Sequence, residues 1–238
     1  MSAPGLQQLD ATEVRRTIER LERRIGARFP DRGIRRVAQA LLALADDVTA
    51  AASGARGWLH WLRVVTRALM ALLLAGTAFG LARLADDAVP SGPARTLDWV
   101  PLIESGVNDL VFLAIAVFFL AALPGRVVRG RLLRRLHRLR SLAHIVDMHQ
   151  LTKDPERLRA DFVRTDASAR PGLGRADMEH YLDYCSELLS LTSKVAALCA
   201  EESQDPLVLD TVGTIETLTT GMSRKIWQKI SLLPDGAD

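Results

Sequence analysis

Two long runs without a charged residue, at positions 68–82 and 110–125, constrain the fold of this chain more than any other feature. A quarter of the chain is charged and 48% is hydrophobic, so the apolar residues are concentrated rather than spread evenly. As a helix, the first run spans only ~22 Å of a ~30 Å hydrocarbon layer. Arginines at its ends would extend to the headgroups, with Trp58 and Trp61 at the interface. We therefore expect membrane helices over residues 58–84 and 107–123, the second ended by Pro124-Gly125.

Charge around these runs predicts their orientation. Arg56, Arg63 and Arg67 precede or open the first span, and only Arg95 lies well inside the connection at residues 85–106. A basic cluster follows the second span directly: Arg126, Arg129, Arg131, Arg134 and Arg135. Positive residues stay on the cytoplasmic side, so both termini are expected in the cytoplasm, and we predict a bacterial inner-membrane location. The alternative is a buried hairpin in a soluble helical protein, because runs this short also occur as core helices.

The basic cluster itself has two possible partners. Its position directly after a membrane span favours anionic lipid headgroups. Nucleic acid is not expected, since no aromatic residues are interleaved with the arginines and no nucleic-acid motif is present. We therefore predict membrane lipid as the partner of this cluster.

The remainder of the chain has the periodicity of helices, and no segment alternates as a strand would. Asp10 opens a first helix, whose inward face is expected to carry Val14, Ile18, Leu21 and Ile25. Asp31 opens a second that is expected to end at a break over residues 53–57. Beyond the spans, apolar spacing predicts that the second one continues, after a kink, into a long helix. A short helix after Asp154-Pro155, to about residue 163, and two longer ones at 176–200 and after Asp205-Pro206 follow. The inward residues expected in the longer two are Tyr181, Cys185, Leu188, Leu189, Val195 and Leu198 in the first, and Leu209, Val212, Ile215, Leu218, Met222, Ile226 and Ile230 in the second. The sequence predicts an all-α protein with cytoplasmic helices at 1–57, a membrane hairpin at 58–125 and a cytoplasmic helical domain at 126–238.

The stretch HIVDMHQLTKDPERL, residues 144–158, raises the question of a metal or catalytic site. On a helix His144 and Asp147 lie ~60° apart and can touch, whereas His149 lies ~140° from His144 and points elsewhere. The favoured interpretation is a helix junction, in which Asp154 caps the next helix and Pro155 takes its first position. With no nucleotide-binding, hydrolase or metalloprotease motif in the chain, we expect neither an enzyme nor a cofactor.

Small and ionisable residues in the spans are the candidate functional positions. Gly76 and Gly80 form a GxxxG pattern, which lets another helix approach closely, either the second span of the same hairpin or another copy of the chain. Arg67 and Asp109 are ionisable groups at membrane depth, and such groups suggest a functional site, here the mouth of a pore.

The order of parts over residues 10–150 resembles that of the bacterial SLATT-type two-span proteins. That resemblance implies a membrane effector of bacterial defence that oligomerises and breaches the membrane, with the Gly76/Gly80 face as a helix contact. Two functions are thus in view. One is a self-associating membrane protein whose spans form or gate a conducting path under the control of its cytoplasmic helices. The other is a tether whose C-terminal helices bind a cytoplasmic protein partner.

Overall fold

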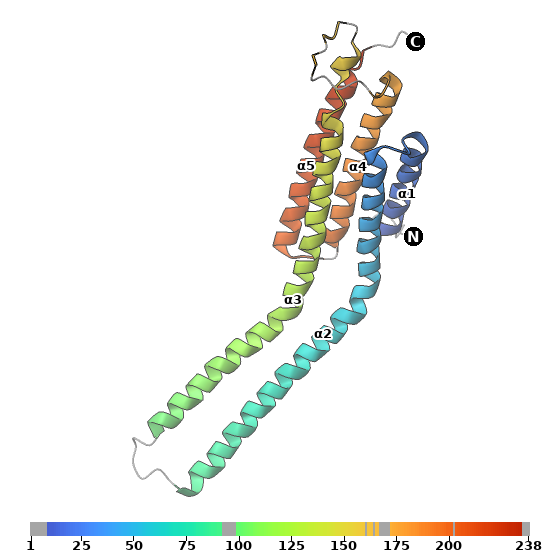
Figure 1. Ribbon diagram of the computed structural model, residues 1–238. Helices are drawn as coiled ribbons and strands as arrows, with labels where there is room; N and C mark the ends of the chain where they lie inside the picture. Colours follow the sequence, from blue (N-terminus) through green and yellow to red (C-terminus); the bar gives the residue numbers. More distant parts are fainter. Residues whose placement is uncertain are drawn as a thin grey trace, which may run out of the picture. The chain divides into compact units, whose positions relative to one another are not determined.

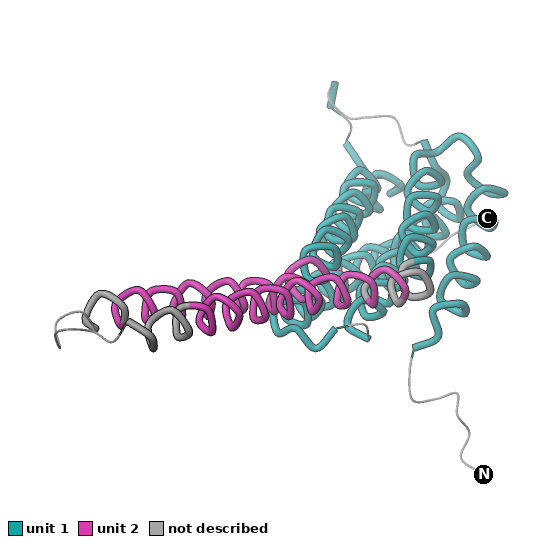
Figure 2. Tube along the Cα trace, turned by 90° about the horizontal axis from the view of Figure 1, so that it is seen from below, with its two compact units in different colours: residues 1–53, 129–238 teal, residues 54–128 magenta. Residues whose placement is uncertain are grey.

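The computed structural model describes residues 9–91, 99–159, 161–163, 165–166, 172–201 and 203–234. Every regular element in these residues is helical, which confirms the all-α prediction. The order is α1 (Ala11–Arg28), α2 (Gly33–Ser91), α3 (Trp99–Leu151), the short 3-10 helix η2 (Pro155–Leu158), α4 (Arg175–Glu201) and α5 (Pro206–Ser231) (Figure 1). The chain divides into two compact units, coloured separately in Figure 2: Met1–Ser53 with Arg129–Asp238, and Gly54–Val128.

Helix α1 of the first unit forms as its sequence predicts. The Asp10 carboxylate accepts a hydrogen bond from the Thr12 amide at 2.8 Å, which caps the helix N-terminus. Its predicted inward face is buried throughout: Val14, Ile18, Leu21 and Ile25. At the end of α1, the Phe29 ring packs edge-on against Tyr181 of α4, with 5.4 Å between ring centroids. Ion pairs Arg24–Glu187 at 2.9 Å and Arg28–Asp177 at 3.1 Å flank this contact between α1 and α4.

Helices α4 and α5 run side by side, and α4 buries more residues than any other helix (Figure 1). The predicted buried set of α4 is buried in the structure: Tyr181, Cys185, Leu188, Leu189, Val195 and Leu198. Helix α5 buries a single stripe, begins at the predicted Asp205-Pro206, and has its Leu207 amide capped by the Asp205 carboxylate at 3.1 Å. Leu209 is an error in the predicted stripe, because it is exposed while its neighbour Val208 is fully buried.

Of the two long helices, α2 lacks the break predicted at residues 53–57, whereas α3 is continuous past the second span, as the predicted continuation into a long helix requires. Helix α2 continues through residues 53–57, and α3 continues through Pro124-Gly125. A proline removes one helical hydrogen bond, but a long apolar helix tolerates that loss where the surrounding turns remain intact. The connection is also shorter than predicted, since α2 reaches Ser91 and α3 begins at Trp99; residues 92–98, with Arg95, lie outside the described part. Pro155 opens one 3-10 turn, not a helix reaching residue 163.

The second unit exposes its apolar residues. Two stretches in the described part of the chain, His60–Arg83 of α2 and the part of α3 that begins at Ile103, are long and apolar enough to cross a membrane. Only 6% and 0% of their most apolar windows are buried. Leu72, Phe112 and Phe118 are 70%, 68% and 64% exposed. These helices therefore lack the burial expected of a core hairpin in a water-soluble protein.

Candidate functional site

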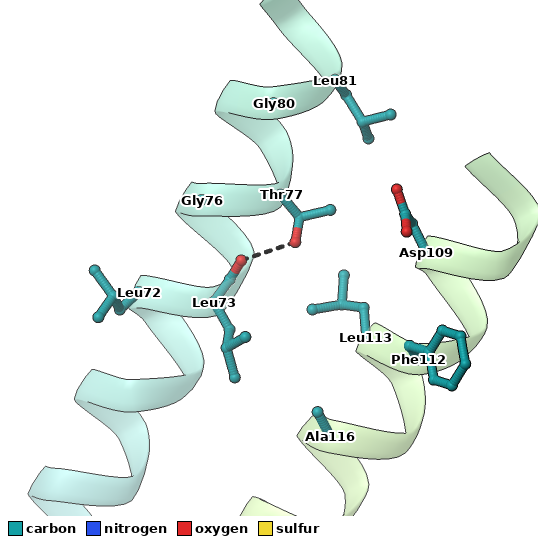
Figure 3. Close-up of a pocket in the computed structure, with 10 residues that line it drawn as sticks. All are labelled: Leu72, Leu73, Gly76, Thr77, Gly80, Leu81, Asp109, Phe112, Leu113 and Ala116. Atoms are coloured by element: carbon teal, nitrogen blue, oxygen red, sulfur yellow. Dashed lines mark hydrogen bonds between the residues drawn. The ribbon is translucent and has the colours of Figure 1, made fainter. Parts of the chain in front are cut away.

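A groove of about 650 Å³ lies between the two apolar helices of the second unit (Figure 3). Helix α2 contributes Leu72, Leu73, Gly76, Thr77, Gly80 and Leu81, and α3 contributes Asp109, Phe112, Leu113 and Ala116. Both helices present these positions at three- and four-residue spacing, so each lines the groove with one face. Apart from Thr77 and Asp109, every side chain of the lining is apolar or absent.

Gly76 and Gly80 are open to that groove. A Cβ atom built on either glycine meets nothing within 4 Å among the described residues. Close packing of α3 against these glycines would have filled that space, so this conformation of the hairpin does not use their small size. The Gly76/Gly80 face is therefore free to receive another group.

The two polar residues of the groove differ in their partners. The Thr77 hydroxyl donates to the Leu73 carbonyl one turn earlier, at 2.9 Å, so its hydrogen is satisfied within α2. The Asp109 carboxylate points toward the side of α2 that carries Thr77 and Leu81 (Figure 3). In the described part of the chain no donor or cation lies within bonding distance of it. An ionisable group beside leucine and phenylalanine side chains is costly without a partner, and such positions are typically functional.

Arg67 lies apart from this groove. Its side chain is exposed on α2, and ten residues separate it from Thr77, which corresponds to ~15 Å along a helix. The structure therefore does not bring Arg67 and Asp109, the two predicted pore-mouth residues, together. Beside Arg67, the buried Thr66 hydroxyl donates to the carbonyls of Leu62 and Arg63, at 3.0 and 3.1 Å.

The basic cluster after the second span is only partly committed to internal contacts. Arg126 places its guanidinium 5.2 Å from the centroid of the Phe119 ring. Arg129 pairs with Asp205, the cap of α5, at 3.5 Å. Arg126, Arg131 and Arg134 are exposed, whereas Arg129 and Arg135 are half-buried. Three arginine side chains of the cluster are thus exposed at the surface.

The stretch at residues 144–158 is a helix junction. Helix α3 ends at Leu151, and the Asp154 carboxylate accepts from the Glu156 amide at 3.3 Å as the 3-10 turn begins. His144 is exposed, while Asp147 accepts a hydrogen bond from the Gln150 amide group at 2.7 Å. Within the described residues, no three His, Cys, Asp or Glu side chains gather as metal ligands would.

This junction also holds a polar cluster that the sequence did not predict. The Lys229 ammonium of α5 donates to the carbonyls of Gln150 and Lys153, at 2.9 and 3.2 Å, and so ties α5 to backbone acceptors at the end of α3 and just beyond it. Nδ1 of His149 lies 3.2 Å from the Tyr181 hydroxyl of α4. The only sequence signal for these contacts was a lysine in the last turn of α5, because partners 32 and 79 residues apart leave no local pattern.

Burial dominates the electrostatics of this cluster. It lowers the pKa of His149, and the positive charges of Lys153 and Arg36 lower it further. Burial likewise lowers the pKa of both Lys153 and Lys229, and it raises the pKa of the Cys185 thiol to about 12. The thiol therefore stays protonated, and the imidazole is favoured in its neutral form. The arrangement stabilises a helix end and contains no activated nucleophile.

Comparison of the chain with protein-family models, with curated proteins and with solved structures finds no match. The groove and the surfaces around it are therefore interpreted from their own chemistry.

Proposed function

We propose that this protein is a self-associating membrane protein whose two spans line or gate a conducting path, under the control of its helical unit in the cytoplasm. The groove between α2 and α3 carries this proposal. It combines an open Gly76/Gly80 face, which suits the approach of another helix, with an unpaired carboxylate on Asp109. A carboxylate that lines a path between apolar helices can replace part of the water around a passing cation.

The surface of the second unit supports placement in a bilayer. Its exposed leucine and phenylalanine side chains suit an apolar solvent. The charge pattern supports a bacterial inner-membrane location with both termini in the cytoplasm. Arg126, Arg131 and Arg134 would then lie at the cytoplasmic headgroups, where arginines bind anionic lipid. The resemblance to SLATT-type effectors agrees with this proposal as a resemblance of architecture.

Membrane depolarisation tests this function directly. The intact chain is expressed inducibly in bacteria with a potential-sensitive dye, beside a Gly76→Leu/Gly80→Leu variant at matched membrane levels. The first carbon of each new side chain has open space within the chain, so the variant should insert and fold while its groove is filled. We expect depolarisation by the intact chain and its loss in this variant.

A second pair of glycines supplies the matched control. Gly57 on α2 and Gly125 on α3 also have nothing within 4 Å of an added Cβ, and neither lines the groove. The Gly57→Leu/Gly125→Leu variant carries the same chemical change and should depolarise like the intact chain. Equal activity of all three proteins would show that the groove has no part in conduction.

A tether is the second candidate function, and one observation favours it. Ile145, Met148 and Leu151 expose an apolar strip along the last turns of α3. Such a strip in the helical unit suits a cytoplasmic protein partner that buries it. If the intact chain does not depolarise cells, while an Ile145→Ser/Met148→Ser variant loses a partner that the parent recruits to the membrane, the tether is the better description.

A further inference from the structure

Two opposite charges of the second unit occupy the same level without meeting. The Arg83 guanidinium lies over the Phe79 ring, 5.0 Å from its centroid, so its charge is held back at the level of Phe79. The Asp109 carboxylate lines the groove beside Thr77, Gly80 and Leu81 (Figure 3). Along α2, Thr77 lies just before Phe79, and Gly80 and Leu81 lie just after it. One residue corresponds to ~1.5 Å along a helix, so the two charges lie at nearly equal depth.

Within one chain these charges do not meet. Around α2, Arg83 lies ~20° from Gly76 and ~60° from Gly80, which line the groove, but its guanidinium is turned to the Phe79 ring instead. Thr77 faces the groove that contains Asp109, whereas Phe79 is not part of its lining. Among the described residues neither Arg83 nor Asp109 has an ion-pair partner. Within the described part of the chain, each is thus a charge without an ion-pair partner at the end of an apolar span.

From this placement we infer that copies of the chain associate through an ion pair between Asp109 of one copy and Arg83 of the next. Copies inserted in the same orientation hold both groups at one depth, so no vertical shift is needed for them to meet. The exposed Phe79 of one copy would then lie near Phe112 and the open Gly76/Gly80 face of the next copy. This inference rests on the proposed self-association and names the residues that select the partner surface.

The pair is compatible with two types of assembly. Two copies can exchange both ion pairs about a two-fold axis, or the contact can repeat from copy to copy and close into a ring when the rotation allows it. In a ring, every copy uses both of its charges, and none remains unpaired in the apolar layer. A ring also encloses an axis, as a conducting path requires.

Subunit counting in lipid vesicles tests the ion pair. The full chain, fused to a fluorescent protein at its N-terminus, is reconstituted at high dilution, and the copies per assembly are counted from photobleaching steps. We expect the parent to form assemblies. Asp109→Arg and Arg83→Asp should each lower the assembled fraction roughly three- to tenfold, the range expected for one polar contact between membrane helices.

Rescue between copies identifies the partner. The Asp109→Arg chain and the Arg83→Asp chain, mixed in one vesicle, restore both ion pairs only if each pair joins two chains. We expect the mixture to recover the parental assembled fraction, as should the chain that carries both substitutions. Recovery by the doubly substituted chain alone would place the pair inside one chain and overturn the inference.

Glu104 provides the charge control. It lies on α3 about 140° around the helix from Asp109 and does not line the groove, so Glu104→Arg should assemble like the parent. The neutral variants Asp109→Asn and Arg83→Gln keep the test valid if charge reversal disturbs insertion, and both should weaken assembly in the same direction. If all of these variants assemble like the parent, the ion pair is wrong while self-association stands. If the parent chain itself stays monomeric in the vesicles, the proposed self-association, and with it the proposed function, is wrong.

Discussion

The two units of this chain treat their apolar and charged side chains in opposite ways. In the first unit Leu188, Leu189 and Ile215 are fully buried, and charges such as Arg24 and Glu187 are paired at the surface. In the second unit Leu72 and Phe112 are exposed, and Arg83 and Asp109 have no ion-pair partner among the described residues. The first unit thus buries a core of its own, whereas the second leaves its apolar side chains exposed, which is what the proposed bilayer location requires.

Truncating the core should give the largest difference between the units. Leu188→Ala removes a fully buried side chain and should lower the free energy of unfolding of the first unit by about 2–5 kcal/mol. Leu72→Ala, which truncates the same side chain at an exposed position, should change it by less than about 0.5 kcal/mol. Urea unfolding of the full chain in detergent, followed by the helical circular dichroism, measures both. Equal losses would mean that the second unit is part of one continuous core.

Two glycines extend the comparison to packing. A Cβ on Gly33 would lie 2.5 Å from Cε1 of His149, and the hydrogen bond to Tyr181 restrains that ring. Gly33→Ala should therefore cost about 1–3 kcal/mol of stability. Gly76→Ala has open space and better helix propensity, so it should be neutral or slightly stabilising. His149→Ala combined with Gly33→Ala should cost less than the sum of the single changes, and strict additivity would contradict the contact.

Capping of α5 should have a smaller effect. Asp205→Ala removes the acceptor for the Leu207 amide and the partner of Arg129, with an expected loss of about 1–2 kcal/mol. Asp210→Ala on the exposed side of the same helix is the matched control and should be near neutral. Thermal unfolding of the two variants measures the difference, and a loss shared by both would assign it to helix charge in general.

The sequence predicted these units unequally for a physical reason. Inward faces such as Val14–Ile18–Leu21–Ile25, and caps such as Asp205, are set by local spacing and were predicted correctly. A helix break was overpredicted at residues 53–57, because local propensity was given more weight than the cooperativity of a long helix. The relative positions of Arg83 and Asp109 along the two helices could not be predicted from local sequence, because they depend on how α2 and α3 align with each other across the connection between them.

The smallest expected effect is a pH dependence centred on His149. Its pKa is lowered in the folded chain, chiefly by burial, so between the folded and unfolded pKa values the unfolded state binds more protons. Stability should accordingly be constant above about pH 6.5, the usual pKa of histidine, and decrease as the pH falls below it. Urea midpoints from pH 7.5 to 5 should show a shallower decrease in His149→Asn than in the parent. The matched change at the exposed His144, His144→Asn, should leave the parental slope intact. A parental slope in His149→Asn would instead assign the acid sensitivity to the carboxylates, whose protonation removes surface pairs such as Arg24–Glu187, and the junction would then have no special role in sensing pH.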